Sequence, residues 1–435
     1  MNQKTTSRGH AIRLIIGLIA VLAIASILVI DPGSNLMNHA SAIDAESHPN
    51  NLPHANPGGK AATFSTQGNV NLTGEYFQAQ GTNGRSCVSC HIPEEAWSIN
   101  PGTLQDLFDQ TGGTHPVFNT LDANNPSMDV STPAARQMAY SMMLSRGVFR
   151  RGGTPRANSE WELIAVEDPH GFPALDRLVH WRRVMPTINF KQGSATVNWD
   201  GGNSVGVDQE AGLRNQAARN VIGAQQGPAA PPEVIDDIVA FELSLSTAQL
   251  IVPGVGRLDS DGARGGAEEL SKMPKPIAGG RFDLFDAWIN DANPRRAQIA
   301  RGQEIFNSTN ANGRSCNGCH NSPNNGTNVG NALFDVRAAS AAVRPTDFPL
   351  YTFRSKTTGE TRQLTDAGRG NITGLWLDLG KFKTPTLRAL AARAPYFHNG
   401  IAPTLTDVVL HYEKHLLFVY TDQERADLVA FLNAL

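Results

Sequence analysis

The sequence predicts a mainly α-helical chain of two similar halves with long loops, behind a separate N-terminal segment. The pattern Cys-X-X-Cys-His occurs twice, at residues 87–91 and 316–320. The same four residues, Asn-Gly-Arg-Ser, precede it both times. A repeated motif with repeated flanks indicates an internal duplication, so we expect both halves to share one fold.

A helix is expected before each motif and another at the end of each half. Phe77 and Phe306 each lie ten residues before the first cysteine of their motif, in short helical patterns. Residues 237–241 (Asp-Ile-Val-Ala-Phe) match residues 427–431 (Asp-Leu-Val-Ala-Phe), and both carry apolar residues at helical spacing. Ahead of the second segment, Thr-X-X-Glu at residues 421–424 is a capping-box pattern that marks a helix start.

The two motifs contain all four cysteines of the chain. Cys-X-X-Cys-His is the attachment pattern of c-type haem, in which both thiols bind the haem covalently and the histidine binds iron. A zinc site or a redox dithiol could also use paired cysteines, but neither requires the adjacent histidine. The sequence therefore predicts two covalently bound haem c groups. Their attachment and iron-binding residues are Cys87, Cys90 and His91 in the first half, and Cys316, Cys319 and His320 in the second.

A helix before each haem and a closing helix are the plan of a cytochrome c-like domain. We expect one such domain at residues 46–250 and another at 251–435. A stretch rich in Gly, Pro and charge at residues 252–280 marks the boundary.

The N-terminus predicts export. Lys4, Arg8 and Arg13 precede an uncharged, mostly apolar run at residues 14–30, and Ala-Ser-Ala at residues 40–42 is a plausible cleavage site. Residues 1–45 are therefore expected to be a signal peptide or a membrane anchor, and the expected location is the bacterial periplasm. The net charge of −3 gives no sign of a nucleic-acid partner.

Several longer motifs resemble one family. They are Lys-Thr-Pro-Thr-Leu-Arg at 383–388, Ala-Pro-Tyr-Phe-His-Asn-Gly at 394–400, Thr-Asp-Ala-Gly-Arg at 365–369, Met-Pro-Thr-Ile-Asn at 185–189 and Trp-Asp-Gly at 199–201. Together they closely resemble the di-haem cytochrome c peroxidase family, which includes the MauG-type enzymes. The resemblance covers most of both predicted haem domains and is stronger in the second.

The resemblance implies a role for each haem. The haem at His91 would react with hydrogen peroxide, and the haem at His320 would pass electrons to it. Trp199 matches a tryptophan that lies between the haems in the family, although an ordinary core tryptophan is the alternative. The family also binds a calcium ion between its domains. The positions that match its ligands are Asn189, Arg393 and Pro395.

The second haem departs from the peroxidase pattern. Peroxidases of the family use a methionine ligand in this region, but the chain has no methionine after Met273. Tyr412 stands at the matching position, as in MauG-type proteins. A phenolate is a hard anionic donor, so it should lower the potential relative to methionine, which raises it. His411 and His415 are rival candidates for this ligand. A further alternative is that Tyr412 packs near the haem without binding iron. For His398, a structural role is favoured over iron ligation.

The acid–base group that peroxide cleavage needs is less clear. The family's glutamate lies downstream of its tryptophan motif, where residues 207–227 offer Glu210 and, as a second carboxylate, Asp208. A solvated surface charge is the alternative for both. Gly202 stands where the family usually has an arginine. His115 could be a removable sixth ligand of the first haem, or a loop histidine without such a role.

The leading functional prediction is an exported di-haem oxidoreductase. It would react with hydrogen peroxide at the first haem and move electrons through the second. Its electron donor would be a small cytochrome c, a cupredoxin or a protein substrate whose residues the enzyme oxidises. Tyr412 favours the protein substrate. The alternative is a non-enzymatic di-haem electron carrier. A redox sensor anchored by the N-terminal run is a third, weaker hypothesis.

Overall fold

A computed structural model describes residues 46–435, which form one compact unit. The predicted signal peptide or anchor lies outside the described residues. None of the helices within residues 46–435 has the length and apolar character of a membrane-spanning segment. Helix accounts for 33% of the structure and strand for 17%. Helix therefore dominates as predicted, whereas the short strands are an addition to the expected fold.

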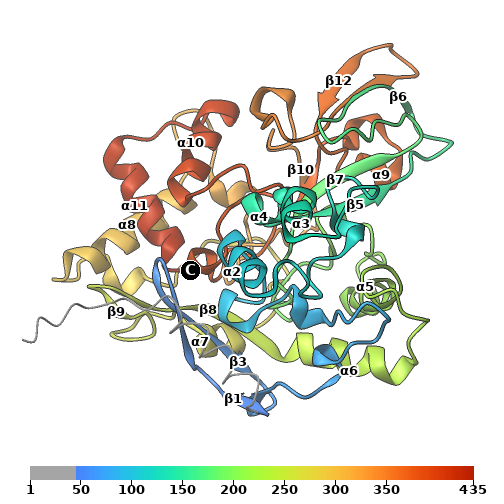
Figure 1. Cartoon of the computed structure of the whole chain (residues 1–435). Coiled ribbons are helices and arrows are strands. Elements are labelled where there is room, and N and C mark those ends of the chain that lie inside the picture. The colour runs from blue at the N-terminus through green and yellow to red at the C-terminus, as the bar shows by residue number, and fades with distance from the viewer. Residues whose placement is uncertain (1–45) are drawn as a thin grey trace, which may run out of the picture. The chain divides into compact units, whose positions relative to one another are not determined.

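Both halves of the chain contribute helices (Figure 1). Those of the first half are α2 (Pro101–Thr111), α3 (Pro133–Ala139), α4 (Ser141–Arg146), α5 (Gln209–Gly223) and α6 (Pro232–Ser244). Those of the second half are α7 (Ala267–Lys272), α8 (Pro294–Asn307), α9 (Gly370–Thr373), α10 (Leu405–Leu416) and α11 (Asp422–Asn433).

The packing expected in both halves is present, although the helix expected before the first motif is only a short 3₁₀ turn. A single 3₁₀ turn, η1 (Glu75–Phe77), packs against α6, and α8 packs against α11. Phe77 meets Phe241 edge to face at 5.4 Å between ring centroids, and Phe306 meets Phe431 at the same 5.4 Å. The capping box predicted for the last helix is present at the start of α11. The repeated sequence pattern therefore corresponds to a repeated packing arrangement.

The strands form five small sheets. One sheet has the order β2 (Pro53–Asn56), β3 (Gly59–Ser65), β8 (Leu245–Val252), β9 (Gly256–Arg257). A second has the order β12 (Thr361–Leu364), β11 (Leu350–Ser355), β6 (Trp161–Glu167). The remaining pairs are β1 (Ser47–Pro49) with β4 (Asn69–Asn71), β5 (Val148–Gly153) with β7 (Leu178–Arg183), and β10 (Leu333–Phe334) with β13 (Phe382–Lys383).

Backbone pairing joins the two halves directly. Strand β6 of the first half pairs antiparallel with β11 of the second, and Trp161 packs edge to face on Phe353 between them. At the end of the chain, the Leu435 carbonyl accepts a hydrogen bond from the Gln249 amide of β8, at 3.2 Å. These contacts place the two motif-bearing regions within a single framework.

Candidate functional site

The first motif forms a tight 3₁₀ turn, η2 (Cys87–Ser89). The His91 amide donates a hydrogen bond to the Cys87 carbonyl at 3.1 Å. On the imidazole, Nδ1 lies 3.0 Å from the Trp97 carbonyl oxygen. A carbonyl partner on Nδ1 fixes the ring orientation and leaves Nε2 available to a metal.

The second motif repeats this geometry at η6 (Cys316–Gly318). The His320 amide donates to the Cys316 carbonyl at 3.0 Å, and Nδ1 lies 2.6 Å from the Gly326 carbonyl oxygen. As in the first motif, the carbonyl comes six residues after the histidine. All four cysteines are free thiols. Two unpaired thiols beside an imidazole with an available Nε2 are the donor set that covalent haem needs.

A cavity of about 600 Å³ opens beside Cys90 and His91. This volume is in the range of ligand pockets, roughly 300–1,000 Å³. Its wall is strongly cationic, which fits the two carboxylate groups of a haem. The cationic side chains that line it are Arg150, Arg151, Arg182, Arg183, Arg219 and Lys383.

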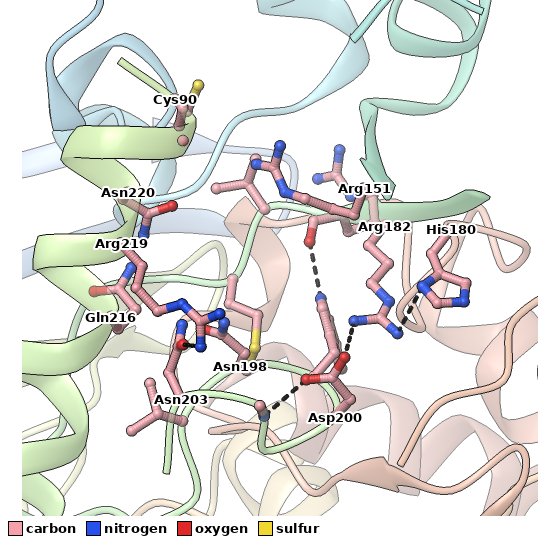
Figure 2. A pocket seen from close by; sticks show the side chains of 18 of the residues that line it. Cys90, Arg151, His180, Arg182, Asn198, Asp200, Asn203, Gln216, Arg219 and Asn220 are labelled. Carbon is pink, nitrogen blue, oxygen red and sulfur yellow. Dashed lines mark hydrogen bonds and ion pairs between the residues drawn. The ribbon is translucent and has the colours of Figure 1, made fainter. Parts of the chain in front are cut away.

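Helix α5 presents amide and guanidinium groups to this first cavity. Figure 2 shows Gln216, Arg219 and Asn220 projecting from α5 on the side of Cys90. Arg219 donates a long hydrogen bond, 3.4 Å, to the Asn203 side-chain oxygen. The one carboxylate among the cavity residues is Asp200, which Arg182 already binds at 2.5 Å.

Neither catalytic candidate of the first half lines this cavity. Glu210 lies in the first turn of α5, where its side chain is exposed and pairs with Arg214 at 2.9 Å. His115 is half-buried, and its Nδ1 accepts a hydrogen bond from the Val117 amide at 3.2 Å. Burial, and then the Arg85 cation, lower the pKa of His115. The catalytic roles of Glu210 and His115 therefore stay predictions without a supporting contact.

A second cavity, of about 430 Å³, is lined by Cys316, Cys319 and His320 and is mostly apolar. Tyr412 of α10 lines it too, and burial raises the pKa of its phenol. The hydroxyl of Tyr412 makes no hydrogen bond to any residue within 46–435. Tyr420 brings a second phenol, whose oxygen lies 3.6 Å from the Cys316 sulfur. The sequence pattern did not single out Tyr420.

The rival histidines of α10 point elsewhere. Nε2 of His411 lies 2.8 Å from the Val336 carbonyl oxygen, and the ring lies 4.7 Å from that of His415, tilted by 40°. Neither histidine is among the residues that line the second cavity. Of the three candidate ligands on this helix, Tyr412 is the one that faces the cavity.

Trp199 lines both cavities. Its indole nitrogen donates to the Arg183 carbonyl at 2.8 Å, and its own carbonyl accepts from the Lys383 amide at 2.7 Å. Lys383 also borders both cavities, and burial lowers the pKa of its amine to about 8. The tryptophan is thus held by backbone contacts at the wall that the two cavities share.

A buried charge network forms part of this wall. Arg182 donates two hydrogen bonds to Asp366, at 2.7 and 2.8 Å, and one to Asp200. Nε2 of His180 lies 3.6 Å, and Nε2 of His398 3.9 Å, from the Asp366 carboxylate. His180 and Arg182 line the first cavity, whereas His398 lines the second. Figure 2 shows Arg182 in contact with Asp200 and His180.

His398 has a structural position in this network. Its ring stacks on Phe382, with centroids 3.7 Å apart and planes inclined by 16°. Burial lowers its pKa to about 3, so the ring is neutral at physiological pH. The sequence singled out this residue and the motif that contains Asp366, but not the contact between them.

The positions that match calcium ligands make contacts within the chain. The Asn189 side chain is occupied by Thr247, accepting from its amide at 2.7 Å and donating to its carbonyl at 3.0 Å. The guanidinium group of Arg393 binds the Thr386 carbonyl, and Arg183 binds the carbonyl that precedes Pro395. Calcium binding at these positions stays a prediction, and no step below involves it.

The chain was compared with known proteins. No protein-family model matches it. It is 33% identical over 172 residues to the cytochrome-c peroxidase IdrP1 of Pseudomonas sp., covering 35% of this chain and 43% of that protein. It is 31% identical over 153 residues to the cytochrome c peroxidase Ccp of Escherichia coli, covering 35% of this chain and 28% of that protein.

A longer match, 25% identical over 268 residues, is to the methylamine utilization protein MauG of Methylorubrum extorquens. It covers 58% of this chain and 64% of MauG. Among solved structures, a MauG-like protein associated with microbial copper homeostasis aligns over 82% of this chain and 83% of its own, with a TM-score of 0.40 and 16% identity. In each of these three curated relatives, the match spans less than two thirds of the protein. With its two Cys-X-X-Cys-His sites, the chain is similar over part of its length to the cytochrome-c peroxidases and to MauG of the di-haem peroxidase superfamily.

Proposed function

We propose that the chain is an exported, periplasmic di-haem oxidoreductase that reacts with hydrogen peroxide at the first site and moves electrons through the second. The observation that carries the proposal is that two cavities of matching histidine geometry share Trp199 as a wall residue. The relatives named cytochrome-c peroxidase support the peroxide reaction at family level. When bound, the haem iron supplies the redox chemistry.

The chain's own residues would have distinct tasks. His91 and His320 would hold the iron from the proximal side, because their Nε2 atoms are available. The cationic wall of the first cavity would hold the haem carboxylates. Hydrogen bonds to a peroxide would come from Gln216, Arg219 and Asn220. These donors would orient the peroxide in a cavity that offers no free carboxylate to act on it. Tyr412 would be the second ligand at the second site, as in a MauG-type enzyme.

The second candidate function is a di-haem electron carrier without peroxide chemistry. One observation favours it: Asp200 and His180, which line the first cavity, both lie in the buried charge network of Arg182 and Asp366. Proton transfer between the peroxide oxygens commonly uses a carboxylate or a histidine. If the hydrogen-bond donors of α5 cannot support peroxide cleavage without such a group, the first haem would only exchange electrons.

Stopped-flow optical spectroscopy of the purified di-haem protein with hydrogen peroxide tests these alternatives. Mixing should start from the fully oxidised form and, separately, from the half-reduced form. A rapid spectral change from the oxidised form would support a MauG-like enzyme. A change only after half-reduction would indicate an ordinary di-haem peroxidase. No change from either form would overturn the enzyme proposal in favour of the carrier.

A further inference from the structure

Glu242 is a buried carboxyl group in the wall of the first haem site. It lies near the end of α6 with 2% of its surface exposed. Together with Cys87, Cys90 and His91 it lines a small cavity of about 60 Å³. Its Oε2 atom is buried and has no hydrogen-bond partner within residues 46–435. A buried carboxyl group without a partner is costly, so its position calls for a functional reason.

The internal duplication shows that the fold itself does not require this carboxyl. The segment that ends in Phe241 matches the segment that ends in Phe431, and both phenylalanines pack on the helix before their motif at 5.4 Å. The next residue is Glu242 in the first half and Leu432 in the second. Leu432 lines the second cavity, as Glu242 lines the small cavity at the first motif. The two haem sites therefore differ at a matched position, with a carboxyl group in one and an alkyl group in the other.

The groups around Glu242 leave it without a counter-charge. The titratable and charged side chains that line the same cavity or interact electrostatically with Glu242 are Tyr76, Arg85, Cys87, Cys90, His91 and Arg151. Both arginines are already paired with Asp122, at 2.8 Å for Arg85 and 3.3 Å for Arg151. Haem attachment would turn both thiols into thioethers, which do not ionise. Burial raises the pKa of Glu242 to about 8, so the carboxyl changes protonation near physiological pH.

We propose that Glu242 is a redox-linked proton-binding group of the first haem site. When one electron enters that site, from the second haem or from an external one-electron donor, the Glu242 carboxylate binds one proton from solvent water. When the electron leaves, the proton returns to water. A negative charge in a low-dielectric wall opposes the arrival of an electron, and protonation removes that charge. The proposal rests on haem binding at His91, as proposed above, but not on reactivity with peroxide.

The test is a spectroelectrochemical titration of both haems at a series of pH values from about 6 to about 10, bracketing the raised pKa of Glu242. The midpoint potential of the first haem should be level below pH about 8, where the carboxyl is protonated in both redox states. Above that pH it should fall, with a slope approaching about 59 mV per pH unit, the tenfold step for a one-electron couple. Glu242→Gln and Glu242→Leu should flatten that slope. Glu233→Gln, which changes an exposed carboxyl on the same helix, is the control and should retain it.

The reciprocal variant Leu432→Glu should introduce a pH-dependent potential at the second haem. Unchanged slopes in both Glu242 variants would overturn the proposal. If neither variant retains haem, reduction-induced infrared difference spectra of the wild-type protein decide, because uptake of a proton by Glu242 requires a new carbonyl band of a protonated carboxylic acid. A flat slope in a protein that reacts with peroxide rejects this inference alone, whereas a steep slope without peroxide reactivity rejects the proposed enzyme function alone.

Discussion

At the scale of single residues, Tyr412 makes the most direct prediction about the second haem. Its phenol faces the same cavity as His320, whereas that of Tyr420 lies beside the Cys316 sulfur. Tyr412→Phe should change the optical spectrum of the oxidised second haem, because it removes the proposed oxygen ligand. Tyr420→Phe, a loss of the same hydroxyl group in the same cavity, should leave that spectrum unchanged. Equal spectra for Tyr412→Phe and the wild type would exclude ligation by this tyrosine.

Asp366 should be a large single contributor to stability. Burial disfavours its ionisation, but Arg182 outweighs that effect and holds the pKa of Asp366 well below its usual range. Asp366→Asn would leave the buried Arg182 cation short of its main partner, which costs about 3–5 kcal/mol in comparable buried pairs. Urea unfolding measures this loss. Asp347→Asn is the matched control, since its contact with Arg146 is partly exposed and should be worth about 1 kcal/mol or less.

His398 should make stability depend on pH. Its pKa is about 3 in the folded chain because of burial, whereas a histidine in an unfolded chain has a pKa of about 6.5. Between these values the unfolded chain binds the additional proton, so the free energy of unfolding falls as pH falls. The slope for one proton is about 1.4 kcal/mol per pH unit. Urea unfolding at several pH values below 6.5 should give a shallower fall for His398→Asn than for the wild type, and parallel curves would refute the assignment.

At the scale of secondary-structure elements, the crossing of α8 and α11 depends on Gly302. A Cβ atom on Gly302 would lie 1.9 Å from the Asp427 carbonyl oxygen, which is backbone and cannot move aside cheaply. Alanine normally stabilises a helix relative to glycine by about 1 kcal/mol. Here Gly302→Ala should instead destabilise the protein by about 1–3 kcal/mol, the usual cost of overpacking.

Thermal unfolding, followed by the absorbance of the second haem, measures the effect of Gly302→Ala. A suitable control is Gly102→Ala in α2. There the added methyl group meets only the side-chain oxygen of Asn100, at 3.1 Å, so a change within about 1 kcal/mol is expected. A stabilised Gly302→Ala variant would mean that the two helices can separate without cost.

The sequence predicted the elements that repeat and missed those that do not. The helix ending each half and the Phe77/Phe241 and Phe306/Phe431 pairs follow from local spacing that occurs twice, whereas the capping box of α11 follows from a local pattern found in the second half. Pairing of β6 with β11 joins residues nearly two hundred positions apart, and no local pattern encodes it. The same holds for the site. Both Cys-X-X-Cys-His motifs are local signals, whereas contacts such as His398 with Asp366 exist only in the folded chain.

At the scale of the whole molecule, Trp199 connects the two candidate haem sites. It borders both cavities, and backbone contacts to Arg183 and Lys383 fix its position. If electrons cross this wall through the indole, Trp199→Ala should slow electron transfer from the second haem to the first, and Trp199→Phe should slow it less because one aromatic ring remains.

Flash reduction of the second haem, followed optically at the first, measures the transfer rate directly. Midpoint potentials of both haems serve as the control, because a change in driving force would alter the rate without any change in the path. A reduced rate at unchanged potentials would assign the effect to the indole itself. An unchanged rate in Trp199→Ala would show that electrons cross elsewhere along the shared wall, where Lys383 also borders both cavities.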